Sequence, residues 1–284
     1  MALALLLHPA QTLALDDWTI HPSTVIGLTA LGWLYFRRAR SAEGAGPSIG
    51  QRVAFFSGLI LLFLILNGPL HDLSDFYLFS GHMVQHLIME LIVPPLLIAG
   101  TPGWMLRPGL GWPVIGALAR RITTPIMAFA IFNVTLSFWH IPALYNTALL
   151  HHNVHILQHV TFLVASVLMW WPLMSSLPEL PRLSYPGQML YCFLMTLPMS
   201  IVAIYIAMAD TVLYPLYASS PRLWGITPKM DQLIGGLIMW IPGGLFFYGV
   251  MTVVFFRWQR QGAAGDGAEA AQGSRGALTP ASSR

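Results

Sequence analysis

Residues 78–99 read LFSGHMVQHLIMELIVPPLLIA, and this stretch decides the class of fold. It is long enough to cross the hydrocarbon core of a membrane as a helix, which takes about 20 residues. The apolar run is interrupted by His82, His86 and Glu90, which follow one another at four-residue steps. On a helix, this spacing places all three side chains on one face. The stretch therefore predicts a transmembrane helix with a polar stripe that starts near one end.

The rest of the chain has the composition of a membrane protein. Of its 284 residues, 56% are hydrophobic and only 9% are charged, whereas about a quarter of the residues in soluble domains are charged. Segments that cross lipid must pair their backbone groups internally, so long apolar stretches are expected to be helices. We predict an all-α, polytopic membrane protein with seven transmembrane helices, at residues 23–36, 53–70, 78–99, 122–139, 154–174, 186–209 and 232–256.

The basic residues predict the orientation of these helices. Of the 14 Lys and Arg residues, twelve fall in the first, third and fifth connections or after the last stretch, and only Arg222 and Lys229 fall elsewhere. By the positive-inside rule, the N-terminus lies outside and the C-terminus is cytoplasmic. We predict a short outer N-terminal segment over residues 1–22, a transmembrane domain over 23–258, and a disordered cytoplasmic tail over 259–284, which is small, polar and rich in Gly and Ala.

Several function classes are disfavoured by what the chain lacks. The single cysteine, Cys192, cannot form an intrachain disulfide or a paired thiolate site. The basic residues are scattered and do not alternate with aromatic ones, so we expect no nucleic-acid partner. The spacings typical of nucleophilic catalysis and phosphate binding are missing, and we therefore do not expect an enzyme.

All ten histidines lie on the predicted outer side or in the outer third of the bundle. His82 and His86 form one pair four residues apart, and His155 and His159 form a second pair in HHNVHILQHV. Each pair presents two imidazoles on one helix face, and a site with several histidines and no cysteine suits copper or a haem. A single histidine at a membrane interface is more often a polar anchor, but two such pairs predict a metal site. The less certain candidates for it are His71, Asp72 and His140.

Glu90 lies one further turn into the membrane, and its role stays open at this point. It is equally well interpreted as a hydrogen-bond acceptor for His86, as a proton-relay group, or as a protonated acid bonded to a neighbouring helix.

Two stretches carry a resemblance to a known family. FSGHMVQHLIMELIVPPLLIAGTP (79–102) and WHIPALYNTALLHHNVHILQHVTFLVASVLMWWPL (139–173) resemble the CtaG-like assembly factors of caa-type cytochrome c oxidase, a family of seven-span membrane proteins. The resemblance extends from GPLHDLSDFYLFS to DQLIGGLIMWIPGG and excludes the first 20 residues and the tail. The family's histidine motifs fall on His82, His86, His155 and His159, with His140 in the WHxP segment. Glu90 stands where an apolar residue is expected in the family.

The resemblance implies a metallochaperone that helps to mature the oxidase by supplying copper to a subunit with metal centres at the outer side of the membrane. We therefore predict a cytochrome c oxidase assembly factor that binds copper through outward-facing histidines. Its location would be the bacterial cytoplasmic (inner) membrane, with the metal site on the periplasmic side, and its partners would be oxidase subunits and the lipid bilayer.

Two other functions fit the same histidines. Imidazoles from two helices can hold a haem b in an electron-transfer protein. The outer polar groups can also form the mouth of a metal or proton transporter, although the ionisable residues do not continue inward past Glu90, as a transport path would require.

Overall fold

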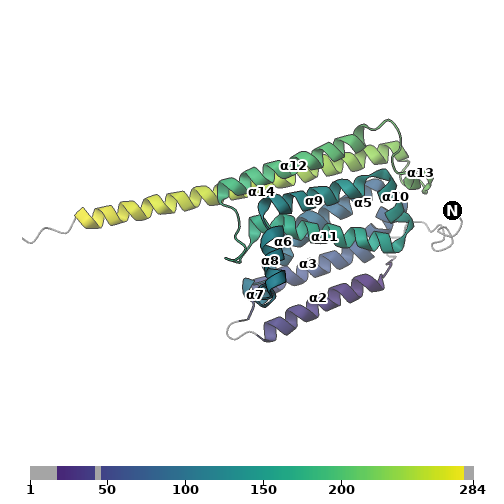
Figure 1. The fold of residues 1–284 in the computed structure, drawn as a ribbon. Coiled ribbons are helices and arrows are strands. Elements are labelled where there is room, and N and C mark those ends of the chain that lie inside the picture. The colour runs from purple at the N-terminus through teal and green to yellow at the C-terminus, as the bar shows by residue number, and fades with distance from the viewer. Residues whose placement is uncertain (1–17, 42–45, 278–284) are drawn as a thin grey trace, which may run out of the picture.

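The computed structural model describes residues 18–41 and 46–277, and these residues form helices and connecting segments with no strand among them (Figure 1). The helices are α2 (Pro22–Arg40), α3 (Ile49–Asn67), α4 (Pro69–Asp72), η1 (Leu73–Tyr77), α5 (Phe79–Leu87), η2 (Ile88–Ile92), α6 (Val93–Gly100), α7 (Gly103–Leu110), α8 (Pro113–Ile122), α9 (Pro125–His140), α10 (Pro142–Leu150), α11 (His152–Met174), α12 (Tyr185–Met208), α13 (Pro215–Ser219) and α14 (Pro228–Ala277).

All seven predicted membrane segments are helical. Within the described part of the chain, five helical stretches are long and apolar enough to cross a membrane: Ile49–Asn67, Phe79–Gly100, His152–Met174, Tyr185–Met208 and Pro228–Ala263. A sixth is counted if α8 and α9, which meet at a 78° bend, act as one span. The all-helical, multi-pass class is thus as predicted, while the number of seven spans and the orientation stay predictions.

The structure differs from the predicted segments in two places. The fourth segment was expected from residue 122, but α9 begins at Pro125, because a residue that precedes proline disfavours the helical conformation. At the other end of the chain, α14 continues to Ala277, past the end of the predicted seventh segment at residue 256, while the disorder predicted for residues 259–284 stays a prediction. Residues 1–17 of the predicted outer segment and residues 278–284 of the predicted tail lie outside the described residues.

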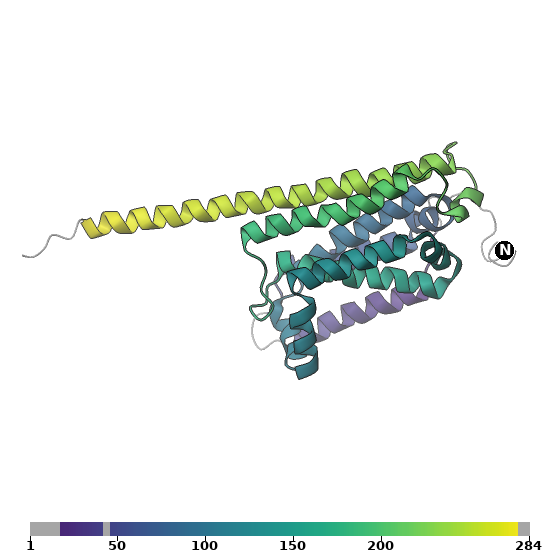
Figure 2. The same cartoon turned by 45° about the horizontal axis from the view of Figure 1, so that its top comes forward.

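The helices pack around a main apolar core, and a second, smaller cluster lies around Tyr35 and Phe55. The main contacts join α12 to α14, α3 to α6, α9 to α11, and α5 to α14. Phe79, Phe162 and Met195 are buried in this core, whereas Ile126 and Ile201 on the flanks are 80% and 69% exposed. Helix α2 lies at the edge of the bundle against α3 (Figure 2). Apolar side chains on the flanks are expected where a helix bundle faces lipid.

Proline residues change the helix that carries the opening sequence. Pro94 and Pro95 have no backbone N–H, so they cannot donate to the carbonyl groups four residues earlier. The chain forms the π-helical turn η2 just before them, and π-turns of this kind are frequent at functional sites. The Glu90 carbonyl, which loses the hydrogen bond from Pro94, accepts one from the Trp170 indole N–H of α11 at 2.9 Å. This contact fixes α11 beside the turn that carries Glu90.

The start of α5 is held by a residue that is distant in sequence. The Asp231 carboxylate of α14 accepts hydrogen bonds from the backbone N–H groups of Phe79, at 2.7 Å, and Ser80, at 3.0 Å. These are two of the N–H groups that a helix leaves unpaired at its N-terminus, where a negative charge is also favourable. Asp231 therefore positions the first turns of α5, which carry His82.

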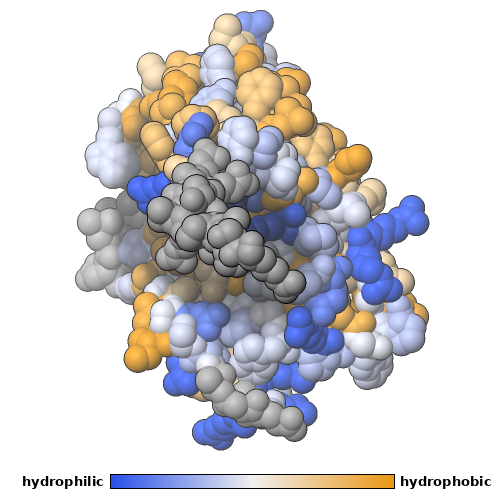
Figure 3. Space-filling model, turned by 90° about the vertical axis from the view of Figure 1, so that its left-hand side faces the viewer, coloured by the Kyte–Doolittle hydropathy of each residue, from blue (hydrophilic) through white to orange (hydrophobic). Residues whose placement is uncertain are grey.

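The two ends of the bundle are formed by different elements. At one end lie α7, α8 and the projecting part of α14, and at the other lie α10 and α13 (Figure 1). Figure 3 shows the first end, where hydrophilic side chains lie beside hydrophobic ones. An ion pair joins Arg107 to Glu179 at 3.0 Å.

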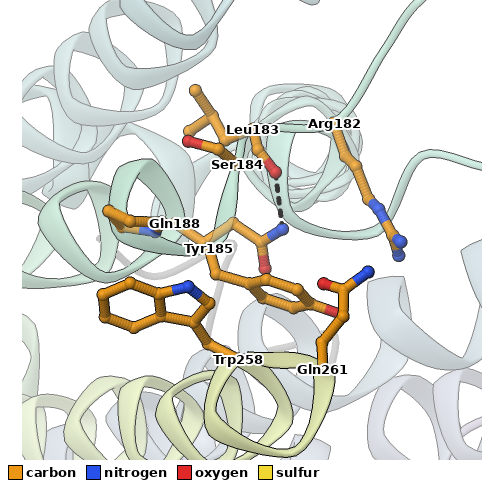
Figure 4. Close-up of a pocket in the computed structure, with 8 residues that line it drawn as sticks. Arg182, Leu183, Ser184, Tyr185, Gln188, Trp258 and Gln261 are labelled. Carbon is orange, nitrogen blue, oxygen red and sulfur yellow. Dashed lines mark hydrogen bonds between the residues drawn. The ribbon is translucent and has the colours of Figure 1, made fainter. Parts of the chain in front are cut away.

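A pocket of about 350 Å³ lies between the start of α12 and α14 and is lined by residues such as Arg182, Gln188 and Trp258 (Figure 4). The predicted metal-binding residues belong to other elements.

Candidate metal site

The two predicted histidine pairs face each other across the interface of α5 and α11. The ring centroids of His82 and His86 are 4.4 Å apart on α5, and those of His155 and His159 are 4.3 Å apart on α11. Between the helices, His82 lies 6.1 Å from His155 and 6.3 Å from His159, and His86 lies 5.4 Å from His159. The four imidazoles that the sequence selected therefore meet in one cluster.

Asp75 of η1 lies in contact with three histidines from three helices. One of its carboxylate oxygens is 3.2 Å from His155 Nδ1 and 3.5 Å from His71 Nε2, and the other is 3.9 Å from His82 Nδ1. Ligand atoms of Asp75, His82 and His155 all lie within 4.8 Å of one another. Two atoms that bind one ion at about 2 Å are at most about 4 Å apart, so small side-chain rotations would bring all three onto one ion.

Several imidazole nitrogens of this cluster are buried without a hydrogen bond. The Nε2 atoms of His82, His86, His155 and His159, and the Nδ1 atom of His82, have no hydrogen-bond partner among the described residues. A buried polar atom that lacks a partner costs roughly 1–3 kcal/mol, and native structures rarely leave several together. Neutral imidazole nitrogens are also the usual ligands of copper, zinc and iron. The cluster thus has the donor atoms that a metal ion would bind.

Glu90 has a partner within its own helix. The carboxylate oxygen Oε1 lies 3.0 Å from His86 Nδ1, and both side chains are buried. A carboxylate that accepts the Nδ1 proton of an imidazole leaves Nε2 free to bind a metal and makes it a stronger base. Of the three interpretations that the sequence left open, the geometry favours Glu90 as the acceptor for His86.

His71 is held on the side of Asp75 by Gln85. The Gln85 amide nitrogen lies 3.0 Å from His71 Nδ1 and 2.5 Å from the Ile65 carbonyl, and the Gln85 oxygen accepts a bond from Ser74 at 2.8 Å. Because the amide nitrogen donates, His71 Nδ1 accepts, and the His71 proton lies on Nε2, toward Asp75. Burial lowers the pKa of His71, so the ring is neutral near pH 7. This arrangement favours His71 as a residue that orients Asp75 over His71 as a direct metal ligand.

The other two predicted residues each have a hydrogen-bond partner outside the group around Asp75. Asp72 accepts a hydrogen bond from the Thr19 hydroxyl at 3.0 Å, and His140 Nδ1 lies 2.7 Å from the Leu136 carbonyl of its own helix. The His140 ring lies 6.5 Å from that of Tyr145, at the edge of the cluster. Neither residue contributes to the group of ligand atoms around Asp75 and His82.

Buried tyrosines form one wall of the cluster. The Tyr145 ring lies 5.1 Å from that of His82, and its hydroxyl is 3.0 Å from the Tyr217 hydroxyl. Tyr217 donates to the Ser74 carbonyl at 2.7 Å, and Tyr214 donates to the His140 carbonyl at 3.1 Å. Burial raises the pKa of Tyr217 and keeps its hydroxyl protonated. These bonds fix η1, which carries Asp75, against α10 and α13.

Sequence reasoning missed Asp75 as a central residue. It was recognisable in the segment HDLSD, because Asp75 follows His71 by the same four residues that separate the members of both histidine pairs. That segment lies outside the long apolar stretches, where a four-residue spacing alone does not indicate a helix. Gln85 was likewise visible beside His86, but its bond to His71 depends on how α4 folds back onto α5.

Comparison with protein families gives one match that spans most of the chain. The family model described as cytochrome c oxidase caa3 assembly factor (Caa3_CtaG) matches residues 30–261. The matched range includes α3 to α13 and therefore all of the histidines and the aspartate of the cluster.

Similar curated proteins come from mycobacteria. Uncharacterized proteins of Mycobacterium bovis and Mycobacterium tuberculosis are each 26% identical to this chain over 248 residues, which is 82% of the chain and 37% of the relative. An uncharacterized protein of Mycobacterium leprae is 25% identical over 259 residues, 84% of the chain and 39% of the relative. The chain thus spans less than two fifths of the length of the curated relatives it matches. No solved structure matches it.

Proposed function

The chain belongs to the cytochrome c oxidase caa3 assembly factor family, and we propose that it binds copper at the histidine cluster and supplies it to the oxidase. Membership of this family favours a role in assembly over catalysis. The observation that carries the copper proposal is the set of buried imidazole nitrogens around Asp75 that have no hydrogen-bond partner among the described residues.

The charges of the cluster support a cation as the bound group. Asp75 and Glu90 are 9% and 4% exposed; Asp75 contacts three histidines and Glu90 contacts one, His86. A buried carboxylate is costly unless a positive charge or several hydrogen bonds compensate for it. A copper ion bound beside Asp75 would balance its charge and at the same time bind the nitrogens of His82 and His155.

The donor set also bears on the choice of metal. Neutral imidazoles with one carboxylate suit copper and other first-row ions, and Cys192, the single cysteine, is buried elsewhere in the core. The spacing of the rings supports a small ion over haem b, because neighbouring rings of the cluster lie in contact and a porphyrin would have to separate them. The family is named for a cytochrome c oxidase. The resemblance implies that copper for this oxidase is the cargo.

The proposed function predicts a copper-dependent assembly defect. Cells from which the protein is deleted should contain oxidase with reduced copper content and reduced activity, both measured on the purified oxidase. Excess copper in the growth medium should partly restore activity, because a higher copper concentration fills the oxidase sites without a protein that delivers the metal. The wild-type gene should restore both properties at ordinary copper, whereas a gene encoding His86→Ala with His159→Ala should not.

The matched control for this experiment is His151→Ala, which removes an exposed histidine at the start of α11. Its gene should restore the oxidase fully. Oxidase with its full copper content in the deletion strain would contradict the proposed role in copper supply.

A further inference from the structure

Two histidines outside the buried cluster connect it to the surface. The His152 ring stacks on that of His21 at 5.5 Å, and the His21 ring contacts that of His71 edge-on at 4.7 Å. The His71 ring then stacks on that of His155 at 5.8 Å. The four imidazoles form a continuous row, which we call the histidine row.

The inner members of this row are more buried than the outer ones. His152 is exposed, His21 is partly buried, and His71 and His155 are buried at 5% and 7% exposure. The row therefore starts at the surface and ends at a residue whose ring nitrogen lies next to Asp75. A buried metal site requires a path for the ion, and donors spaced along that path are the simplest means to lower the cost of removing its water.

The outer part of the row is fixed in place. The backbone N–H of His21 donates to the Asn67 side-chain oxygen at 2.7 Å, and Asn67 is fully buried at the end of α3. Two residues before His21, the Thr19 hydroxyl donates to Asp72 at 3.0 Å. The chain that enters α2 is thereby attached to α3 and α4 at the mouth of the cluster. An interfacial anchor for a lipid headgroup would not need this attachment toward the interior.

We propose that His152 and His21 form a loading site, through which copper passes by ligand exchange to and from the buried cluster. In each step an incoming imidazole binds the ion before the outgoing one leaves, and no electron or proton balance changes between neutral donors. His71 takes part through Nδ1, which becomes free to bind the ion when the Gln85 amide releases it, while the proton stays on Nε2 toward Asp75. This inference rests on the proposed function, because it assigns a route to the copper that the cluster binds.

The test separates the rate of copper binding from its extent. The full-length protein in detergent micelles is mixed with a copper(I) complex of bicinchoninate, and the loss of the colour of the complex is followed by stopped flow. The variant that carries His21→Ala and His152→Ala should bind as much copper as the wild type at equilibrium, but load and release it at least about tenfold more slowly. The single variant His152→Ala, which removes only an exposed side chain, should be slowed as well.

The control is His151→Ala, the exposed neighbour of His152 that has no ring contact in the row, and it should load at the wild-type rate. Unchanged loading rates in the double variant at full stoichiometry would overturn the loading site and leave the proposed function intact. Loss of copper from the double variant at equilibrium would also overturn it, because the two histidines would then belong to the binding site itself. A wild-type protein that binds no copper would instead refute the proposed function.

Discussion

Replacing His82 and His155 together by alanine is expected to abolish stoichiometric copper binding by the purified protein. These two residues come from different helices, α5 and α11, and their ligand atoms belong with Asp75 to the group that lies within 4.8 Å. Without them, only His86 and His159 of the four predicted imidazoles remain, and neither belongs to the group of ligand atoms around Asp75. The measurement is elemental analysis of copper per protein chain after removal of loosely bound metal.

The folded state of this variant must be verified by its melting temperature without copper. The substitutions remove three ring nitrogens that have no hydrogen-bond partner among the described residues, both of His82 and Nε2 of His155, so part of the lost packing is offset by relief of that penalty. His151→Ala is the matched control and should retain full copper. A double variant that folds and binds as much copper as the wild type would refute the assignment of these ligands.

Asp75→Asn should weaken copper binding by about 100-fold, near the upper end of what is found when charged partners of a metal site are removed. The amide has the shape of the carboxylate and can still accept the bond from Ser74 at 3.1 Å. It loses the negative charge that faces His71, His82 and His155. Competition for copper against a chelator of known affinity measures the change.

Stability measurements distinguish this effect from a folding defect. A 100-fold loss of affinity removes about 2.7 kcal/mol of the stabilisation that saturating copper gives the folded state. Without copper, the variant should be at least as stable as the wild type, because a buried carboxylate is costly to desolvate. Asp72→Asn, one turn earlier and bonded to Thr19, is the control and should bind copper normally. Equal affinities of the wild type and Asp75→Asn would contradict the central position of Asp75.

The sequence predicted those parts of the site that depend on spacing along a single helix. Pairs four residues apart gave His82 with His86 and His155 with His159, and the same rule places Glu90 next to His86 and Asp75 next to His71. The apolar stretches gave the helices, since lipid allows few other structures. These inferences need only the geometry of one helix.

The remaining features depend on contacts between distant segments. That the histidines of α5 and α11 face each other depends on the packing of the whole bundle, as does the bond from Trp170 to the Glu90 carbonyl. The π-helical turn η2 is explained by Pro94, which can be read from the sequence. The sequence does not indicate that Trp170 of α11 donates a hydrogen bond to this turn. The approach of His21 to His71 depends on the Asn67 side chain, for which no sequence pattern exists. Such contacts are formed by tertiary structure and leave no periodic signal.

X-ray absorption at the copper edge of the loaded, full-length protein identifies the copper ligands, because it reports the atoms bound to the metal. Nitrogen and oxygen ligands are expected at about 2 Å, with the outer-shell scattering of several imidazole rings and no sulfur. A spectrum dominated by sulfur at about 2.3 Å would place the copper among the buried methionines of the core and contradict the assignment of the histidine cluster.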